Sequence, residues 1–293
     1  MTLQELHALI VETLPAMPRQ VAQAARHIAD HPDEVLIHSM RDLASRAGVS
    51  PATLLRLAQS LRFDGWAEFR AVYAQDLRRA PEAYAERASR ALDRSGVPAL
   101  LQESFVAQRA NLDHTVGVNP PEAFARSAAL LAAADRVFIS AFMSCRGPGL
   151  TFAYLCRMLR DNVFLLGGDA SPLAADLALL RPTDAVLTIN FQPYGQEIDK
   201  IASAVADSGA KLVCLSDSRA TQATRVAEET LLFSVEGPSF FPSLTAAHLL
   251  VESLAISILA HLGDEATRRI RQIENAYYTS GTYSAVNNQR RTS

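Results

Sequence analysis

Residues 39–59 read SMRDLASRAGVSPATLLRLAQ, and this stretch predicts two short helices joined by a tight turn. Ser39 can cap the first helix, and Gly48 follows it, where a positive φ lets the chain leave a helix sharply. Ser50 can cap the second helix, whose first residue is Pro51, a position that has no need of its N–H. This order is typical of a helix-turn-helix, which presents its second helix to the major groove of DNA.

The two sides of the second predicted helix differ in chemistry. The residues expected on its buried side are Leu54, Leu55, Leu57 and Ala58. The residues expected on its exposed side are Ala52, Thr53, Arg56 and Gln59. The exposed side has no acidic residue, whereas an ordinary solvated face mixes acids and bases. DNA binding is therefore favoured over the alternative, a well-capped helical hairpin without that role.

Arginines and small polar residues form the predicted DNA interface. Arginine's planar fork suits phosphates and guanine edges. Phosphate contacts are expected mainly from Arg41, Arg46, Arg62 and Arg70. The residues expected nearest the bases are Ser50, Thr53, Arg56 and Gln59. The predicted interface also includes Ser39, Pro51 and Ala52.

The net charge of −3 conceals a local basic segment. Residues 39–79 contain seven arginines and four acidic residues, which gives a local charge of +3. Lys200 and Lys211 are the only lysines, so nearly all the positive charge of the chain is arginine. A near-neutral total therefore does not count against a nucleic-acid partner.

The composition excludes several classes of protein. The chain has 293 residues, of which 49% are hydrophobic, so it can bury a real core and is not a disordered chain. Its three cysteines have no metal-ligand spacing, and we expect neither a metal nor a cofactor. The amino terminus lacks the basic region of a secretory signal, and no apolar run approaches the roughly 18–20 residues of a membrane-spanning helix. A cytoplasmic location without a membrane partner is expected.

The pattern along the chain changes near residue 136. Before about residue 116 it is helical throughout, whereas afterwards short apolar runs alternate with amphipathic segments, which indicates a parallel sheet covered on both faces. The expected strands are 136–141, 162–166, 185–190, 211–216 and 229–234. The expected helices between and after them are at about 147–160, 173–180, 195–208, 221–228, 244–262 and 264–277. The predicted fold class is an all-α helix-turn-helix domain followed by an α/β domain with a doubly wound, parallel five-stranded sheet.

The first part of the chain resembles the amino-terminal domain of RpiR-type bacterial transcription regulators. The family usually has Gly where Arg62 stands and Tyr where Trp66 stands, and Trp66 and Phe69 are expected in the core. The residues that carry the resemblance are Ser39–Leu43, Ala47–Thr53, Arg56, Leu57, Leu61, Phe63–Trp66 and Glu68–Arg70. In that family Ser50, Thr53 and Arg56 would fall where the recognition helix faces DNA.

The family joins its helix-turn-helix to a sugar-isomerase (SIS) domain, a doubly wound sheet that binds phosphorylated sugars. Residues from about 125 to 265 are similar to it in strand order, spacing and the segment Cys214–Ser218. The resemblance implies a transcription regulator that binds double-stranded operator DNA, responds to a small-molecule effector and forms at least a dimer. The expected divisions are a DNA-binding domain over 1–80, a helical linker over 81–124, a SIS-like domain over 125–278 and a flexible tail over 279–293.

Ligands of open parallel sheets bind beyond the carboxyl ends of the strands, so the loops after Ala141 and Ile189 are the predicted effector site. Both depart from the family pattern. The first lacks the family's glycines, and Phe142 and Met143 would crowd a phosphate. The second has no Ser or Thr, and Pro193 removes a backbone donor. The expected effector-binding residues are Ala141, Phe142, Met143, Ser144, Cys145, Arg146, Asn190, Phe191, Gln192, Tyr194, Gly195 and Glu197.

Three interpretations of this site stay open. It can bind a less charged or partly aromatic ligand, keep a phosphate through Ser144, Arg146 and backbone donors, or serve only in dimerisation. A sugar-phosphate isomerase or binding module with a helical appendage is the alternative function. Catalysis needs a positioned acid or base, for which Glu197 and His248 are the candidates, but a histidine in an apolar helix is more often interior. An enzyme is therefore not expected.

Overall fold

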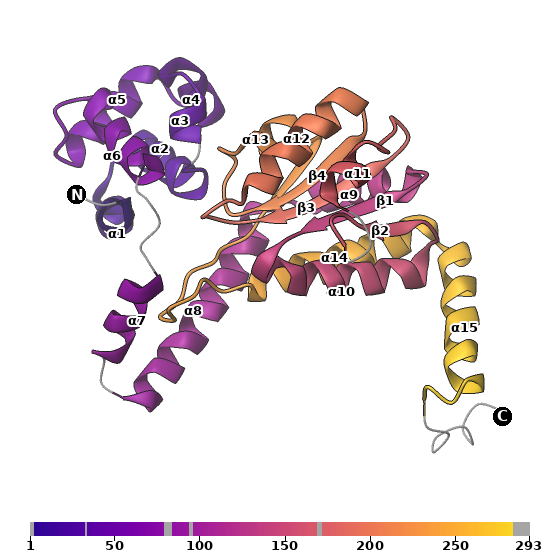
Figure 1. Ribbon diagram of the computed structural model, residues 1–293. Coiled ribbons are helices and arrows are strands. Elements are labelled where there is room, and N and C mark those ends of the chain that lie inside the picture. The colour runs from indigo at the N-terminus through magenta and orange to yellow at the C-terminus, as the bar shows by residue number, and fades with distance from the viewer. Residues whose placement is uncertain (1–2, 33, 79–83, 94–95, 169–171, 284–293) are drawn as a thin grey trace. The chain divides into compact units, whose positions relative to one another are not determined.

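The computed structural model describes residues 3–32, 34–78, 84–93, 96–168 and 172–283. It divides into two compact units, Met1–Glu86 and Arg87–Ser293 (Figure 1). The first is helical, and the second is built around a parallel sheet. Both fold classes predicted from the sequence are confirmed.

The first unit is a cluster of short helices around one apolar core. Phe69 is fully buried there, with Phe63 edge-on to it and Trp66 stacked on it, as the sequence predicted for a core position. Its helices are α1 (Leu3–Thr13), the 3-10 turn η1 (Leu14–Ala16), α2 (Arg19–Asp30), α3 (Glu34–Ile37), α4 (Met40–Arg46), α5 (Pro51–Ser60) and α6 (Trp66–Arg78).

The predicted helix-turn-helix consists of α4 and α5. Ser39 Oγ accepts a hydrogen bond from the backbone N–H of Asp42 at 3.2 Å, and Ser50 Oγ accepts one from that of Thr53 at 3.3 Å. Gly48 has a φ of +65°, which is the left-handed conformation expected between the helices. The side chain of Gln23 donates to the carbonyl of Ala47 at 2.9 Å, so α2 holds the turn in place.

The second unit has five parallel strands in the order β2-β1-β3-β4-β5. All five match the strands expected from the sequence, with β5 two residues shorter at its end. The strands are β1 (Val137–Ala141), β2 (Val163–Leu165), β3 (Ala185–Asn190), β4 (Lys211–Ser216) and β5 (Glu229–Leu232). The helices are α7 (Tyr84–Leu92), which spans the division between the units, α8 (Val97–Val118), α9 (Pro121–Ala133), α10 (Arg146–Leu159), α11 (Leu173–Leu177), α12 (Gln196–Ser208), α13 (Gln222–Val226), α14 (Thr245–Leu262) and α15 (Asp264–Thr279), with the 3-10 turn η2 (Met143–Cys145).

Each face of the sheet has its own apolar core, because side chains alternate along a strand. In β1, Val137 and Ile139 join the core under α9, α10 and α14, whereas Phe138 joins the core under α11, α12 and α13. The helices cover both faces, which explains why the strands are apolar at nearly every position.

Helix α14 differs from one sequence expectation. By length and composition it could cross a membrane, although no apolar run was expected to approach that size. In the structure its buried residues, including Leu250, Val251 and Leu254, pack in the core with α9 and α10. A helix that is apolar on most of its surface is typical of such a central position.

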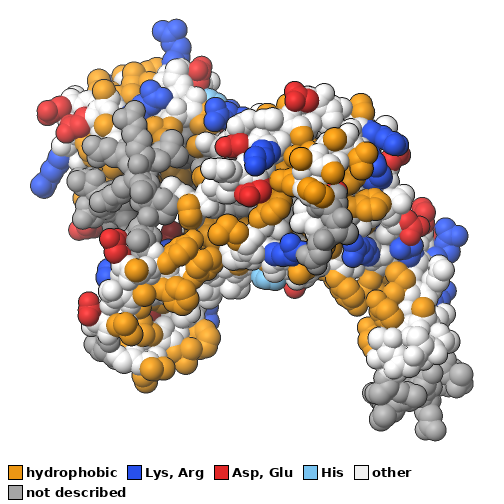
Figure 2. All heavy atoms as spheres, viewed as in Figure 1, with side chains coloured by type: hydrophobic (Ala, Val, Ile, Leu, Met, Phe, Trp, Pro, Cys, Tyr) orange, Lys and Arg blue, Asp and Glu red, His pale blue; other side chains and the backbone are white. Residues whose placement is uncertain are grey.

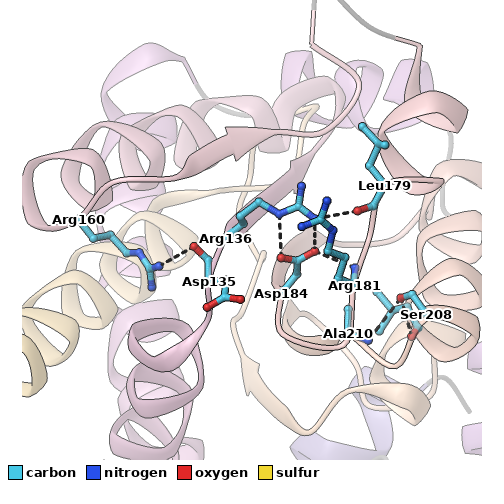
Figure 3. A network of polar contacts seen from close by, with 9 residues as sticks. Asp135, Arg136, Arg160, Leu179, Arg181, Asp184, Ser208 and Ala210 are labelled. Carbon is cyan, nitrogen blue, oxygen red and sulfur yellow. Dashed lines mark hydrogen bonds and ion pairs between the residues drawn. The ribbon is translucent and has the colours of Figure 1, made fainter.

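An ion pair closes the amino-terminal edge of the sheet (Figure 3). Arg136 donates from Nε and Nη2 to the two carboxylate oxygens of fully buried Asp184, at 2.9 and 2.6 Å. Asp184 also accepts from the backbone N–H of Arg181 at 2.8 Å. This edge lies opposite the strand ends where a ligand is expected, so the pair serves the fold.

In the described part of the expected linker over 81–124, α7, α8 and the start of α9 are helical, and α8 belongs to the second unit. The expected tail begins at the last residue of α15, and residues 284–293 lie outside the described residues.

Candidate functional site

The exposed face of α5 differs in two residues from the sequence prediction. Thr53 is buried, because it lies one turn before Leu57 and its Oγ1 is 2.9 Å from the capping Ser50 Oγ. Leu55 is exposed, one turn before Gln59. The residues that α5 exposes along this face are therefore Ala52, Leu55, Arg56 and Gln59.

Two of the expected phosphate-binding arginines have partners inside the first unit. Arg46 Nε donates to Oε1 of buried Glu34 at 2.9 Å, and His27 Nε2 lies 2.8 Å from Oε2. Burial raises the pKa of Glu34, but the hydrogen bonds and charges of Arg46 and His27 outweigh it and hold this pKa below its ordinary value of 4.5. Arg70 donates to the carbonyls of Val35 and Leu36 at the end of α3. These two guanidinium groups position helices, a role that sequence patterns do not show.

Arg41, Arg56 and Arg62 form a second group. All three are exposed, and none makes a hydrogen bond or ion pair with any residue that the structure describes. Arg41 lies in the first turn of α4, two residues after the exposed cap Ser39. Guanidinium groups without internal partners are available to phosphates and base edges.

The loops after β3 and β4 meet at the carboxyl edge of the sheet. Asp217 Oδ1 accepts from the hydroxyl of Tyr194 at 2.8 Å, and Oδ2 accepts from the backbone N–H of Gln192 at 3.0 Å. Asn190 Oδ1 accepts from the hydroxyl of Ser216 at 3.0 Å. Asp217 and Ser216 were not among the predicted site residues, although they are the polar residues at the end of a buried strand.

Burial changes the proton affinity of this cluster. It raises the pKa of Asp217, and the hydrogen bonds from Gln192 and Tyr194 oppose only part of that shift. Burial and the nearby Asp217 also raise the pKa of Tyr194, so its hydroxyl stays a donor. Because the Tyr194 hydroxyl donates to Asp217, this donor is not free for a phosphate at the same place.

The loop after β1 keeps a glycine-like backbone without glycine. Met143 has a φ of +50° and is 84% exposed, so it does not crowd the loop as predicted from the sequence. Phe142 packs against the core under α11 and α12. A Cβ built on Gly149 would lie only 2.3 Å from the Ala141 Cβ, so the glycine in α10 makes room for the alanine at the end of β1.

The pairing of Ala141 with Ile189 brings the first two loops to one edge of the sheet. Ser144 lies in η2, Arg146 begins α10 and Glu197 lies in the first turn of α12, where it faces Gly195. Cys145 is buried, and burial raises its pKa to about 12. His248, considered interior from the sequence, is half-buried and faces Gly147 beside this loop.

Side chains of α8 bind the extended segment that follows β5. Asn119 pairs with both the N–H and the carbonyl of Leu232, at 2.8 and 2.6 Å. One turn earlier, Thr115 Oγ1 accepts from the N–H of Ser234 at 3.1 Å, and Asn111 donates to the carbonyl of Glu236 at 2.7 Å. The helix thus satisfies backbone groups at the edge of the sheet, where a further strand would otherwise pair. We call this set the α8 ladder.

The same segment also contacts a loop of the predicted effector site. Phe241 packs edge-on against Phe191 in the loop after β3, with 6.1 Å between ring centroids. A few residues before Phe241, the carbonyls of Gly237 and Ser239 accept hydrogen bonds from Arg87 of α7. The segment from Leu232 to Phe241 therefore contacts a predicted effector loop, α8 and the helix α7 where the first unit ends.

Comparison with known families agrees with both units. The helix-turn-helix domain of the rpiR family matches residues 8–80, and the SIS domain matches residues 130–257. The chain therefore carries an rpiR-family helix-turn-helix domain followed by a SIS domain. An uncharacterized HTH-type transcriptional regulator of Escherichia coli K12, YfhH, is 22% identical over 263 residues, which cover 87% of this chain and 93% of that protein.

Solved structures share the fold of this chain. The sugar isomerase domain of an RpiR transcription factor from Sphaerobacter thermophilus has a TM-score of 0.57 at 22% identity, covering 60% of this chain and 98% of that one. NanR of Vibrio vulnificus, solved in complex with ManNAc-6P, has a TM-score of 0.51 at 18% identity, covering 94% and 98%. At these identities the likeness concerns the fold.

Proposed function

We propose that this chain is a transcription regulator whose first unit binds double-stranded operator DNA and whose second unit senses a small-molecule effector. The observation that carries the proposal is the exposed face of α5, capped by Ser50, with Arg56 and Gln59 and no acid among its exposed residues. Base edges are read by residues of such a helix, whereas Arg41 and Arg62 flank it and suit phosphates. The DNA-binding residues proposed are Ser39, Arg41, Ser50, Pro51, Ala52, Arg56, Gln59 and Arg62.

The interface proposal omits Thr53 because it is buried. Arg46 could contact DNA only through the half of its side chain that stays exposed beside its bond to Glu34. We propose that the regulator acts in the cytoplasm and without catalysis, because its DNA-binding unit gives the SIS domain a sensing role.

The test of DNA binding uses a duplex selected from a random-sequence library by the full chain. Arg56→Ala should weaken binding by about 1–3 kcal/mol and relax the preference at one base pair. Arg268→Ala, which removes the same charge from exposed α15, is the matched control and should bind like the unmodified chain. Failure of the full chain to select any sequence contradicts the proposal, and unchanged discrimination by Arg56→Ala contradicts the role of that residue.

We propose that the effector binds at the strand-end loops and is not a simple sugar phosphate. Support comes from the loop after β3, which has no Ser or Thr, and from its Tyr194, whose hydroxyl donates to the half-buried carboxylate of Asp217. Thermal-shift measurements on matched phosphorylated and unphosphorylated sugars test this point. At equal concentration, the sugar that binds the folded chain more tightly raises its unfolding temperature more. Selective stabilisation by the phosphorylated member of a pair contradicts the altered-ligand proposal and favours the ligand class bound by NanR.

The proposed route from effector to DNA is the segment Leu232–Phe241 with the α8 ladder. An effector can shift the equilibrium only if it binds two arrangements of this segment with different affinity. Thr115→Val removes the acceptor for Ser234 and should reduce the effect of the effector on DNA affinity, while both ligands still bind. Thr151→Val removes a hydroxyl bonded only within α10 and is the control. If the effector changes DNA affinity equally in Thr115→Val and Thr151→Val, this route is contradicted.

Apolar residues exposed on the second unit support a homodimer. Leu101, Phe105 and Val106 of α8 are exposed, and Figure 2 shows hydrophobic side chains on the surface of this part of the chain. Two helix-turn-helix motifs held one helical turn of DNA apart would read a repeated or palindromic site. Sedimentation of the full chain should give at least a dimer.

A further inference from the structure

Arg62 has a backbone conformation that favours glycine. Its φ is +68°, directly after the end of α5. Its N–H donates to the carbonyl of Gln59 at 3.0 Å, and the N–H of buried Phe63 donates to that of Ala58 at 3.0 Å. This pair of bonds is the Schellman ending of a helix, whose left-handed residue is usually Gly because a Cβ is strained there.

Nothing within the described part of the chain compensates for that strain through the side chain. The guanidinium of Arg62 is exposed and makes no hydrogen bond or ion pair with a described residue. The nearest acids along the chain, Asp64 and Glu68, are linked to each other by the bond from the Asp64 N–H to the Glu68 carboxylate. A cation at a helix end gains from the macrodipole, but this gain is screened by salt and lysine would supply it equally.

We infer that an arginine occupies this left-handed position, despite the strain, because its guanidinium contacts a backbone phosphate of the bound DNA at the far end of α5. The inference rests on the proposed DNA binding. A phosphate is favoured over a base because the amino-terminal residues of a recognition helix reach the base edges, and Arg62 follows its last turn. The first unit thus loses stability at this position and gains affinity for DNA.

Arg62→Gly tests both halves of the inference in the full chain. The unfolding midpoint of the first unit should rise by a few degrees, read from the fluorescence of Trp66, the only tryptophan. For each protomer bound, affinity for the selected duplex should fall about fivefold at 0.15 M salt, and the slope of log K against log salt should become shallower by about 0.9, which is about 1.8 for the proposed dimer. The loss should be equal for mismatched duplexes, as expected of a phosphate contact.

Two further variants provide controls. Arg62→Lys should keep the salt slope and the original midpoint. Asn162→Gly replaces another left-handed residue, with a φ of +59° before β2 in the second unit, and should leave DNA binding and its salt slope unchanged.

Unchanged affinity and salt slope in Arg62→Gly overturn the phosphate contact, and a lower unfolding midpoint overturns the strain. If the unmodified chain binds no duplex, the proposed function fails and the inference fails with it. The two failures can be told apart: if the unmodified chain binds the duplex and Arg62→Gly binds it equally well, only the inference about Arg62 fails.

Discussion

Gly149 in α10 is the position where one methyl group should disturb the predicted effector site. A Cβ there would lie 2.3 Å from the Cβ of Ala141, well inside the ordinary carbon–carbon contact of about 3.5–4.0 Å. Gly149→Ala must therefore push the start of α10 away from the end of β1. That movement displaces the loop between them, which contains Ser144.

The expected change in the free energy of unfolding caused by Gly149→Ala has two opposing parts. Overpacking of this kind costs about 1–3 kcal/mol, whereas alanine gains about 1 kcal/mol over glycine inside a helix. The single substitution can therefore change the free energy of unfolding by little. Ala141→Gly removes the opposing Cβ, so Gly149→Ala should be stabilising in that background. The coupling energy of the double-mutant cycle isolates the steric part, which should be about 1–3 kcal/mol.

Urea unfolding of the four full-length chains measures this coupling. The fluorescence of Trp66 follows the first unit, which should not change in any of the chains. Circular dichroism follows the helices of both units, so the transition that appears in dichroism and not in fluorescence is that of the second unit. The m-values must agree for the free energies to be compared. A coupling energy below about 0.5 kcal/mol would show that α10 and β1 are not packed as closely as described, and the reasoning about this loop would fail.

Three other outcomes are expected. Because the pKa of Glu34 is lowered in the folded state, its stabilisation is present above its ordinary pKa of 4.5 and is lost as the pH falls through the lowered value. Glu34→Gln should thus cost about 2 kcal/mol at pH 7 and progressively less as the pH falls below 4.5, and a cost that does not change with pH contradicts the role of its charge. Asp184→Ala should cost about 3–5 kcal/mol because it leaves Arg136 without its buried partner, whereas Asp161→Ala, at an exposed pair with Arg269, should cost less than about 1 kcal/mol; similar losses contradict the assignment of the buried pair. The folded chain should resist thiol alkylation at pH 8 and react after unfolding, as mass spectrometry can show, because burial raises the pKa of Cys145, Cys156 and Cys214 to about 12, 11 and 12.

Local signals in the sequence were sufficient for the helix-turn-helix and the sheet. The serine caps and Gly48 act within a few residues of themselves, so their roles could be predicted without tertiary structure. The strands were evident because burial on both faces makes them continuously apolar. Arg62 was expected at a position where the family has glycine, and its positive φ fits that resemblance.

Tertiary contacts account for what the sequence did not predict. Arg46 and Arg70 bind Glu34 and Val35 of α3, which lie 12 and 35 residues away from them in the chain. The close approach of Gly149 to Ala141 and the bond from Tyr194 to Asp217 join segments that only the fold brings together. Side-chain type alone cannot distinguish an arginine that positions a helix from one that is free for a phosphate.

The structure changes the interpretation of the predicted effector site. The loss of hydroxyl residues from the loop after β3 was clear in the sequence, but the replacement was not. Tyr194 and Asp217 bind each other across two loops, which gives this edge an aromatic and carboxyl character. The choice between an altered ligand and a phosphate therefore depends on this pair.

The most direct test of the account is a footprint of the full chain on its selected duplex, compared with the double variant Arg41→Ala/Arg56→Ala. The unmodified chain should protect two half-sites about 10 base pairs apart, centre to centre. The double variant should lose this protection while the Trp66 unfolding midpoint stays the same, because neither guanidinium has a partner among the described residues. An unchanged footprint from the double variant would contradict the assignment of α4 and α5 as the DNA-binding surface.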